Sequence, residues 1–218
     1  MAWPIRALLT GTIIPFAQGE GSAIAKSPRA GPVRIGFLGL EGDEQADKRY
    51  HGGPDKALHL YPFDHYARWR QDVPDHPLLG APGAFGENIS SEGLTEADAC
   101  IGDRFRCGTA LIEISQPRQP CWKQATRMMW STLPKLMVKE GRSGWYFRVL
   151  EEGRAQAGDV LTLEERTHPD WSVQRVFALM IGGGWKAEPD ALKALQKVEP
   201  LDEGWRALAA ELLSQSRN

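Results

Sequence analysis

Short apolar runs separated by glycine- and proline-rich turns fill most of this chain, and they restrict the folds that it can adopt. The clearest runs with strand composition cover residues 33–40, 57–61, 98–107, 109–115, 145–150 and 159–165. We identify about seven to nine short strands with few helices between them, a pattern that favours a β-barrel over alternating β-α-β units. Helices are predicted only at the periphery of this barrel, over residues 63–70, 122–130 and 133–140.

The hydrophobic period changes after His168. Ser172 is suited to cap a helix, and the apolar residues that follow it have helical spacing: Val173, Val176, Phe177 and Met180. Two more helices are predicted to begin at Asp190 and Asp202. We therefore predict a mainly β protein with a barrel domain over residues 1–168 and a three-helix domain over residues 169–218. These helices should pack on one another or on the barrel and contribute no ligand to the site.

Composition limits the partners that this chain can bind. Its 218 residues are 42% hydrophobic, which is enough for a core without disulfide or metal support. The formal net charge is -2, without long runs of one sign, so we expect neither nucleic-acid nor membrane binding. The apolar N-terminal run is broken by Gly11 and Pro15, so it is no convincing signal peptide or membrane span. A small soluble ligand is the better expectation.

Cysteine usage points to a reducing environment, and we expect a cytoplasmic protein. The cysteines Cys100, Cys107 and Cys121 are odd in number and lack zinc-site spacing. Cys100 and Cys107 lie in strand-like runs and are interpreted as packing residues. Cys121 differs, because Pro117 and Pro120 force the chain out of the preceding strand.

The surroundings of Cys121 are suited to a reactive or metal-bound thiolate. Arg118 and Lys123 flank it, and nearby positive charge favours the thiolate form of a cysteine. The alternative is that Cys121 is a small buried hydrophobic residue and that the prolines only shape a turn.

Two polar segments are candidates for ligand binding. The loop from Glu41 to Ala57 contains Gly52 and Gly53, which can turn backbone N–H groups toward an anion. The cationic side chains available around this concavity are Lys48, Arg49, His51 and Lys56. Further along, Glu87 and Asn88 could bind the polar edge of a heterocycle. The alternatives are an ordinary solvated turn for the loop and a capping role for the Glu87-Asn88 pair.

The ordered set of motifs resembles the MOSC-domain family. The segments that carry the resemblance are GLEGDEQADKRYHGGPDKALHLYP, FGENIS, IGDRFRCGTALIEISQPRQPC and the three-helix tail. They are most similar to the bacterial branch of 6-N-hydroxylaminopurine resistance proteins. The resemblance implies a MOSC-type β-barrel with a small C-terminal three-helix domain, and it covers nearly the whole chain.

The resemblance also implies a molybdenum cofactor, a molybdopterin, whose metal is held by the motif cysteine, here Cys121. Molybdenum is thiophilic, so a thiolate on a stiff loop is a suitable single protein ligand. We predict catalytic roles for Cys121 and His51. The predicted cofactor-binding residues are Lys26, Lys48, His51, Gly52, Gly53, Asp55, Lys56, Glu87, Asn88 and Arg118.

The expected activity is reduction of N-hydroxylated bases and related compounds, that is, detoxification by a molybdenum-dependent oxidoreductase. No motif for flavin, nicotinamide or iron–sulfur groups is visible, so a separate flavoprotein should donate the electrons. The apolar face of the helical tail could also serve a homodimer.

Three alternatives remain at this point. Cys121 could carry a persulfide as a sulfur carrier, or the chain could be a non-enzymatic module that binds a pterin or another anion. A hydrolase that uses Cys121 and His51 lacks an identifiable third group to orient the histidine.

Overall fold

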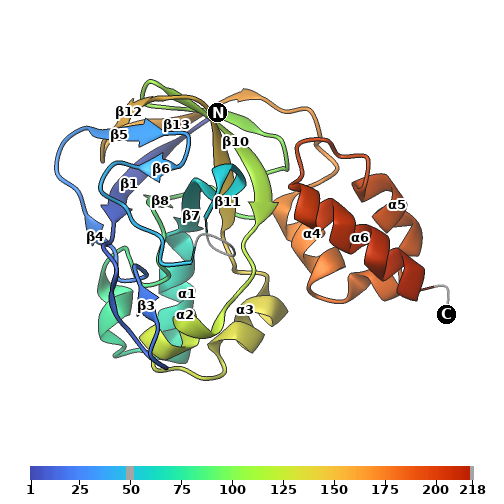
Figure 1. Ribbon diagram of the computed structural model, residues 1–218, viewed down its shortest axis with the longest axis horizontal. Helices are drawn as coiled ribbons and strands as arrows, with labels where there is room; N and C mark the ends of the chain where they lie inside the picture. The colour runs from blue at the N-terminus through green and yellow to red at the C-terminus, as the bar shows by residue number, and fades with distance from the viewer. Residues whose placement is uncertain (48–51, 217–218) are drawn as a thin grey trace.

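The computed structural model describes residues 1–47 and 52–216, and within them seven strands close into a barrel (Figure 1). The barrel strands are β1 (Ala2–Thr10), β7 (Leu58–Pro62), β8 (Ile89–Ser91), β9 (Arg104–Cys107), β10 (Ala110–Pro117), β11 (Trp145–Glu151) and β13 (Val160–Glu165). Their order is β13-β9-β10-β11-β7-β8-β1, and β1 pairs back with β13. Neighbours are antiparallel except β7 and β8. The mainly β, barrel-type fold predicted from the sequence is therefore confirmed.

Shorter strands flank the barrel. β4 (Ser27–Pro28) pairs with the end of β1, and β2 (Ile14–Pro15) pairs with β3 (Gly21–Ser22). A third group consists of β5 (Val33–Gly36), β6 (Gly39–Leu40) and β12 (Gly153–Ala155). The single strand predicted over residues 33–40 is thus a hairpin. The strand predicted over residues 98–107 begins only at Arg104, because a turn with Gly102 at a φ of 80° precedes it.

Three helices gather at one end of the barrel (Figure 1): α1 (Asp64–Asp72), α2 (Trp122–Arg127) and α3 (Leu133–Glu140). Two 3₁₀ turns, η1 (Pro54–Lys56) and η2 (Pro77–Gly80), complete this part. A separate aromatic-rich core lies beneath the helices: Tyr61, Tyr66, Trp69, Leu79, Ala84, Phe85, Met128, Leu133 and Met137. This core anchors α2, the helix that directly follows Cys121.

The C-terminal unit consists of α4 (Val173–Met180), η3 (Gly184–Lys186), α5 (Pro189–Leu195) and α6 (Glu203–Gln215), and it lies on one side of the barrel (Figure 1). Ser172 and Asp202 cap α4 and α6 by accepting hydrogen bonds from backbone N–H groups. Phe177, Leu192 and Trp205 belong to the same buried cluster as the barrel interior. The helices therefore pack on one another and on the barrel, as expected, while their status as a separate domain stays a prediction. No described helix combines the length and apolar character needed to cross a membrane.

The end of β10 is held against the start of β11. Pro117 lies opposite Trp145, and the backbone N–H of Arg118 donates to the carbonyl of Gly144 at 3.0 Å. The buried carboxylate of Glu96 accepts the N–H groups of Ser143 and Gly144 at 2.9 and 2.7 Å. This network of backbone hydrogen bonds fixes the direction in which the chain leaves the sheet toward Cys121.

Gly144 is a position where only glycine fits. Its φ is 71°, and a Cβ atom there would lie 2.3 Å from the carbonyl oxygen of Leu60. We expect Gly144→Ala to lower the free energy of unfolding by about 3 kcal/mol or more, because backbone strain and a steric clash add. Gly141→Ala is the matched control, since Gly141 has a φ of 67° but open space around it. Gly141→Ala should lower the free energy of unfolding by only about 1 kcal/mol. Urea unfolding measures both variants, and an equal decrease in the free energy of unfolding for Gly144→Ala and Gly141→Ala would contradict this explanation.

Candidate functional site

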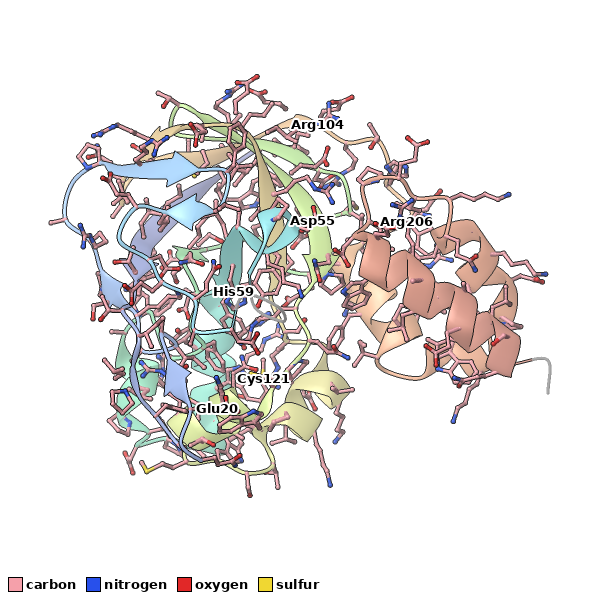
Figure 2. The ribbon with its side chains drawn as sticks, viewed as in Figure 1. Glu20, Asp55, His59, Arg104, Cys121 and Arg206 are labelled. Carbon is pink, nitrogen blue, oxygen red and sulfur yellow. The ribbon has the colours of Figure 1, made fainter. Side chains whose placement is uncertain are left out.

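A pocket with about 610 Å³ of empty space opens beside Cys121. This space includes solvent at the pocket mouth, so the pocket is a partly open cleft. Its lining residues come from the segments that follow β3 and β6, from η1, from the barrel strands β7 and β11, from the segment before β8, and from the β10–α2 connection with the start of α2. Figure 2 shows Cys121 below His59, toward the end of the barrel where α1–α3 lie. None of the lining residues belongs to α4–α6.

The pocket brings together five of the nine predicted site residues that the structure describes. Cys121, Arg118, Lys26, Lys56 and Asn88 all line it. Gly52, Gly53, Asp55 and Glu87 do not. Lys48 and His51 lie outside the described residues.

Cys121 is the cysteine that a ligand can reach. It is partly exposed at the N-terminal boundary of α2, where its backbone N–H donates to Oε1 of Gln124 at 3.2 Å. Cys100 and Cys107 are buried, and burial raises the pKa of the Cys107 thiol to about 12. Among the residues described, no group of three or more His, Cys, Asp or Glu side chains could hold a metal ion.

Arg118 is a buried cation without a carboxylate partner in the described part of the chain. Only 5% of it is exposed, and its Nε and Nη1 atoms have no hydrogen-bond partner. Burial opposes its charge, but electrostatic interactions with Tyr146 and Cys121 outweigh that effect, so the pKa of Arg118 lies above its ordinary value. Burying an unpaired charge is costly. The arrangement is therefore suited to an anion bound beside Cys121.

Lys123, the second predicted cation near Cys121, is partly neutralised. Its Nζ atom lies 2.8 Å from a carboxylate oxygen of Glu20 and donates to the carbonyl of Gly21 at 3.1 Å. Since Glu20 is about half exposed, this ion pair adds little stability, and Lys123 contributes less unbalanced charge than Arg118.

Asp43 is a site residue that the sequence analysis did not identify. Its buried carboxylate accepts hydrogen bonds from the Gly11 backbone N–H at 2.8 Å, from Asn88 Nδ2 at 2.8 Å and from the Lys26 ammonium group. Burial lowers the pKa of Lys26, although Asp43 acts in the opposite direction. Asp43 thus positions two predicted binding residues. Its three partners come from separate segments, so only the folded chain shows this role.

His59 also escaped the sequence analysis, because a histidine in an apolar strand resembles an ordinary core residue. It is 3% exposed, lines the pocket, and lies 5.3 Å from the Tyr146 ring between ring centroids. Burial, followed by the charge of Arg118, lowers its pKa well below the usual value. The carbonyls of Gly86 and Ser143 face the ring and partly offset this, but neither forms a hydrogen bond of normal geometry. His59 is therefore a neutral imidazole at physiological pH.

Two predicted binding residues have protein partners instead. Glu87 is fully buried and accepts hydrogen bonds from the backbone N–H groups of Gly83 and Phe85 and from the Tyr66 hydroxyl. This matches the capping alternative for that segment. The Asp55 carboxylate accepts from Nε of Arg148 at 2.6 Å. Gly53 does adopt a positive φ of 98°, but outside the pocket lining.

Arg118 and Arg148 should respond differently to removal of their charge. Arg118→Met should change the free energy of unfolding of the ligand-free protein by no more than about 1 kcal/mol, because no carboxylate in the described chain pairs with this charge. Arg148→Met is the matched control. Arg148 is paired with Asp55 and Glu113, so its loss should destabilise by about 2 kcal/mol. Urea unfolding of both variants measures the difference, and a large loss of stability in Arg118→Met would refute the unpaired-charge interpretation.

Comparison with known proteins assigns the family. A family model described as the MOSC domain matches residues 47–162. The protein YiiM of Escherichia coli strain K12 is 43% identical over 179 residues, which cover 82% of this chain and 79% of that protein. A protein named Reductase from Gibberella moniliformis is 42% identical over 156 residues, covering 71% of this chain but only 28% of that protein.

Solved structures agree with this assignment. YiiM from Geobacillus stearothermophilus superposes with a TM-score of 0.82 at 33% identity, covering 97% of this chain and 99% of that one. YiiM from Escherichia coli gives a TM-score of 0.78 at 33% identity, covering 99% and 94%. Both matches extend across the barrel and the C-terminal helices. This chain therefore belongs to the MOSC-domain family, in the YiiM branch with additional C-terminal helices.

Proposed function

We propose that this protein is a molybdenum-cofactor-dependent reductase of N-hydroxylated bases and related compounds, with Cys121 as the protein ligand of molybdenum. The observation that carries the proposal is the pairing of a reachable thiol with a buried cation in one pocket. Arg118 has two nitrogen atoms without protein partners in the described chain, and it lines the same pocket as Cys121. A thiophilic metal bound to an anionic organic group matches that combination of donors.

The residues present fit a pterin cofactor that carries a phosphate. Arg118 and Lys26 would bind the anionic group, and Lys56 lines the same pocket. Cys121 would hold the metal through its thiolate, while the cofactor itself supplies the other ligands. When bound, the cofactor would supply the two-electron chemistry that removes oxygen from a hydroxylated nitrogen.

The chain's own residues would orient the ligands. His59 is neutral and lines the pocket, so it offers hydrogen bonding without a second positive charge beside Arg118. Asn88 would shape the pocket rather than bind a ligand directly. Its side chain already forms hydrogen bonds with the Asp43 carboxylate, the Leu9 carbonyl and the backbone N–H of His59. The relative that is named Reductase supports the proposal that this protein is an oxidoreductase.

Replacement of the thiol is the direct test of the proposal. Cys121→Ser should lower reduction of an N-hydroxylated base by more than about a hundredfold, because a protonated hydroxyl is a poor ligand for a thiophilic metal. The free energy of unfolding should change by only about 1 kcal/mol. Cys107→Ser is the matched control. Cys107 is fully buried, so its replacement should reduce stability while activity per folded, molybdenum-loaded molecule is retained.

Metal analysis and mass spectrometry separate the proposal from its rivals. Protein from a cofactor-competent host should contain stoichiometric molybdenum and a releasable pterin. A mass increase of one sulfur atom on Cys121 without molybdenum would instead indicate a sulfur carrier. If Cys121→Ser keeps full activity, both the metal-ligand and the persulfide roles are excluded.

We also predict that the reaction needs an external electron donor. Purified protein with NADH or NADPH alone should not reduce a hydroxylated base, because the sequence contains no flavin- or nicotinamide-binding motif. Addition of a flavoprotein reductase, or of a chemically reduced viologen, should start turnover. Turnover with NADPH alone, in protein free of contaminating flavin, would contradict the prediction.

A further inference from the structure

The C-terminal helices contact the barrel at the strand that leads into the site. Nε1 of Trp205 donates to Oε1 of Gln116 at 2.9 Å, and the backbone N–H of Asp202 donates to the carbonyl of Ser115 at 2.9 Å. On the neighbouring strand β11, Nη1 of Arg148 donates to the carbonyl of Pro200 at 2.8 Å. The segment before α6 and the first turn of α6 are therefore tied to three residues of the barrel wall: Ser115 and Gln116 on β10, and Arg148 on β11.

These same three barrel residues hold Asp55. The Ser115 hydroxyl and Nε2 of Gln116 donate to the Asp55 carbonyl at 2.6 and 3.3 Å, and Nε of Arg148 donates to its carboxylate at 2.6 Å. Each contact with the helical unit is thus only one residue away from Asp55. Figure 2 shows Asp55 on the side of the barrel that faces the unit carrying Arg206.

Asp55 is the central residue of η1, and the next residue, Lys56, lines the pocket. A turn of three residues has little rigidity of its own, and within it the Lys56 backbone N–H donates to the Gly53 carbonyl. The position of the Lys56 backbone therefore depends in part on how firmly its neighbour Asp55 is held.

We propose that the C-terminal helical unit is an indirect part of the binding site, in which Trp205 and Gln116 are positioning residues that fix η1 and, through it, Lys56. Gln116 is the link, since its two side-chain atoms bond to Trp205 on one side and to Asp55 on the other. Gln116 is 2% exposed and Trp205 8%, so water does not readily replace either bond. The role of Lys56 toward a ligand rests on the proposed function, whereas the fixing of η1 does not.

Hydrogen exchange in the full-length protein tests the fixing of η1. Trp205→Phe keeps an aromatic ring but removes the indole donor, and Gln116→Met keeps the side-chain volume but removes both polar atoms. Each variant should increase exchange at the amides of Asp55, Lys56 and Ala57 by about fivefold, as expected when one hydrogen bond that restrains a turn is lost. Trp185→Phe, in η3 of the same unit, is the matched control and should leave these amides unchanged. Unchanged exchange in both test variants would overturn the proposal.

A double-mutant cycle tests whether the effect reaches the pocket through Lys56. Inorganic phosphate is the probe, and its affinity is measured by calorimetry. Trp205→Phe should weaken phosphate binding a few-fold in the otherwise unaltered protein and have no further effect in a Lys56→Met background. Equal losses in both backgrounds would show that Trp205 acts on general stability rather than through Lys56. Failure of the unaltered protein to bind phosphate would count against the proposed function, and the exchange experiment would still decide the positioning role.

Discussion

A positive charge buried without a carboxylate is the constraint on which the site depends. Folded proteins normally pair such a charge. Here the carboxylates near Arg118 have other partners: Asp43 binds Lys26, and Glu87 binds Tyr66 and two backbone N–H groups. No carboxylate of the described chain therefore neutralises Arg118, and an anionic ligand is the group that would do so.

The backbone around Arg118 explains how this costly arrangement persists. The Gly144 carbonyl holds the Arg118 N–H, and Glu96 in turn holds the Gly144 N–H. The other oxygen of Glu96 lies 2.6 Å from Nε2 of His65. A buried carboxylate is thus used to fix the main chain rather than to neutralise the arginine, which leaves the arginine charge available to a ligand.

Strand β10 contacts the barrel, η1 and the C-terminal helical unit, and it leads into the loop that carries Arg118 and Cys121. Its first half pairs with both β9 and β11 inside the barrel, its last residues hold η1 and contact the helical unit, and its end leads to Arg118 and Cys121. Packing of the helical unit and geometry of the pocket are consequently not independent. This coupling gives the division into barrel and C-terminal helices a physical meaning beyond the burial of apolar surface.

The sequence by itself determined the local features of this protein. Period and turn residues predicted most of the barrel strands, although not β8, together with the three C-terminal helices and the exit of Cys121 from β10, because these depend on nearest neighbours along the chain. Cys121 and Arg118 were identifiable for the same reason, since they follow one another closely in a proline-bounded loop.

Only the tertiary structure decided which polar residues share the pocket. Glu87 and Asp55 looked like ligand-binding residues, but distant partners engage them, whereas His59 and Asp43 looked unremarkable and line the pocket. Strand order also decided that Gln116 lies between Trp205 and Asp55. Such roles arise from contacts between segments far apart in sequence, and no local pattern records which buried group will meet which partner.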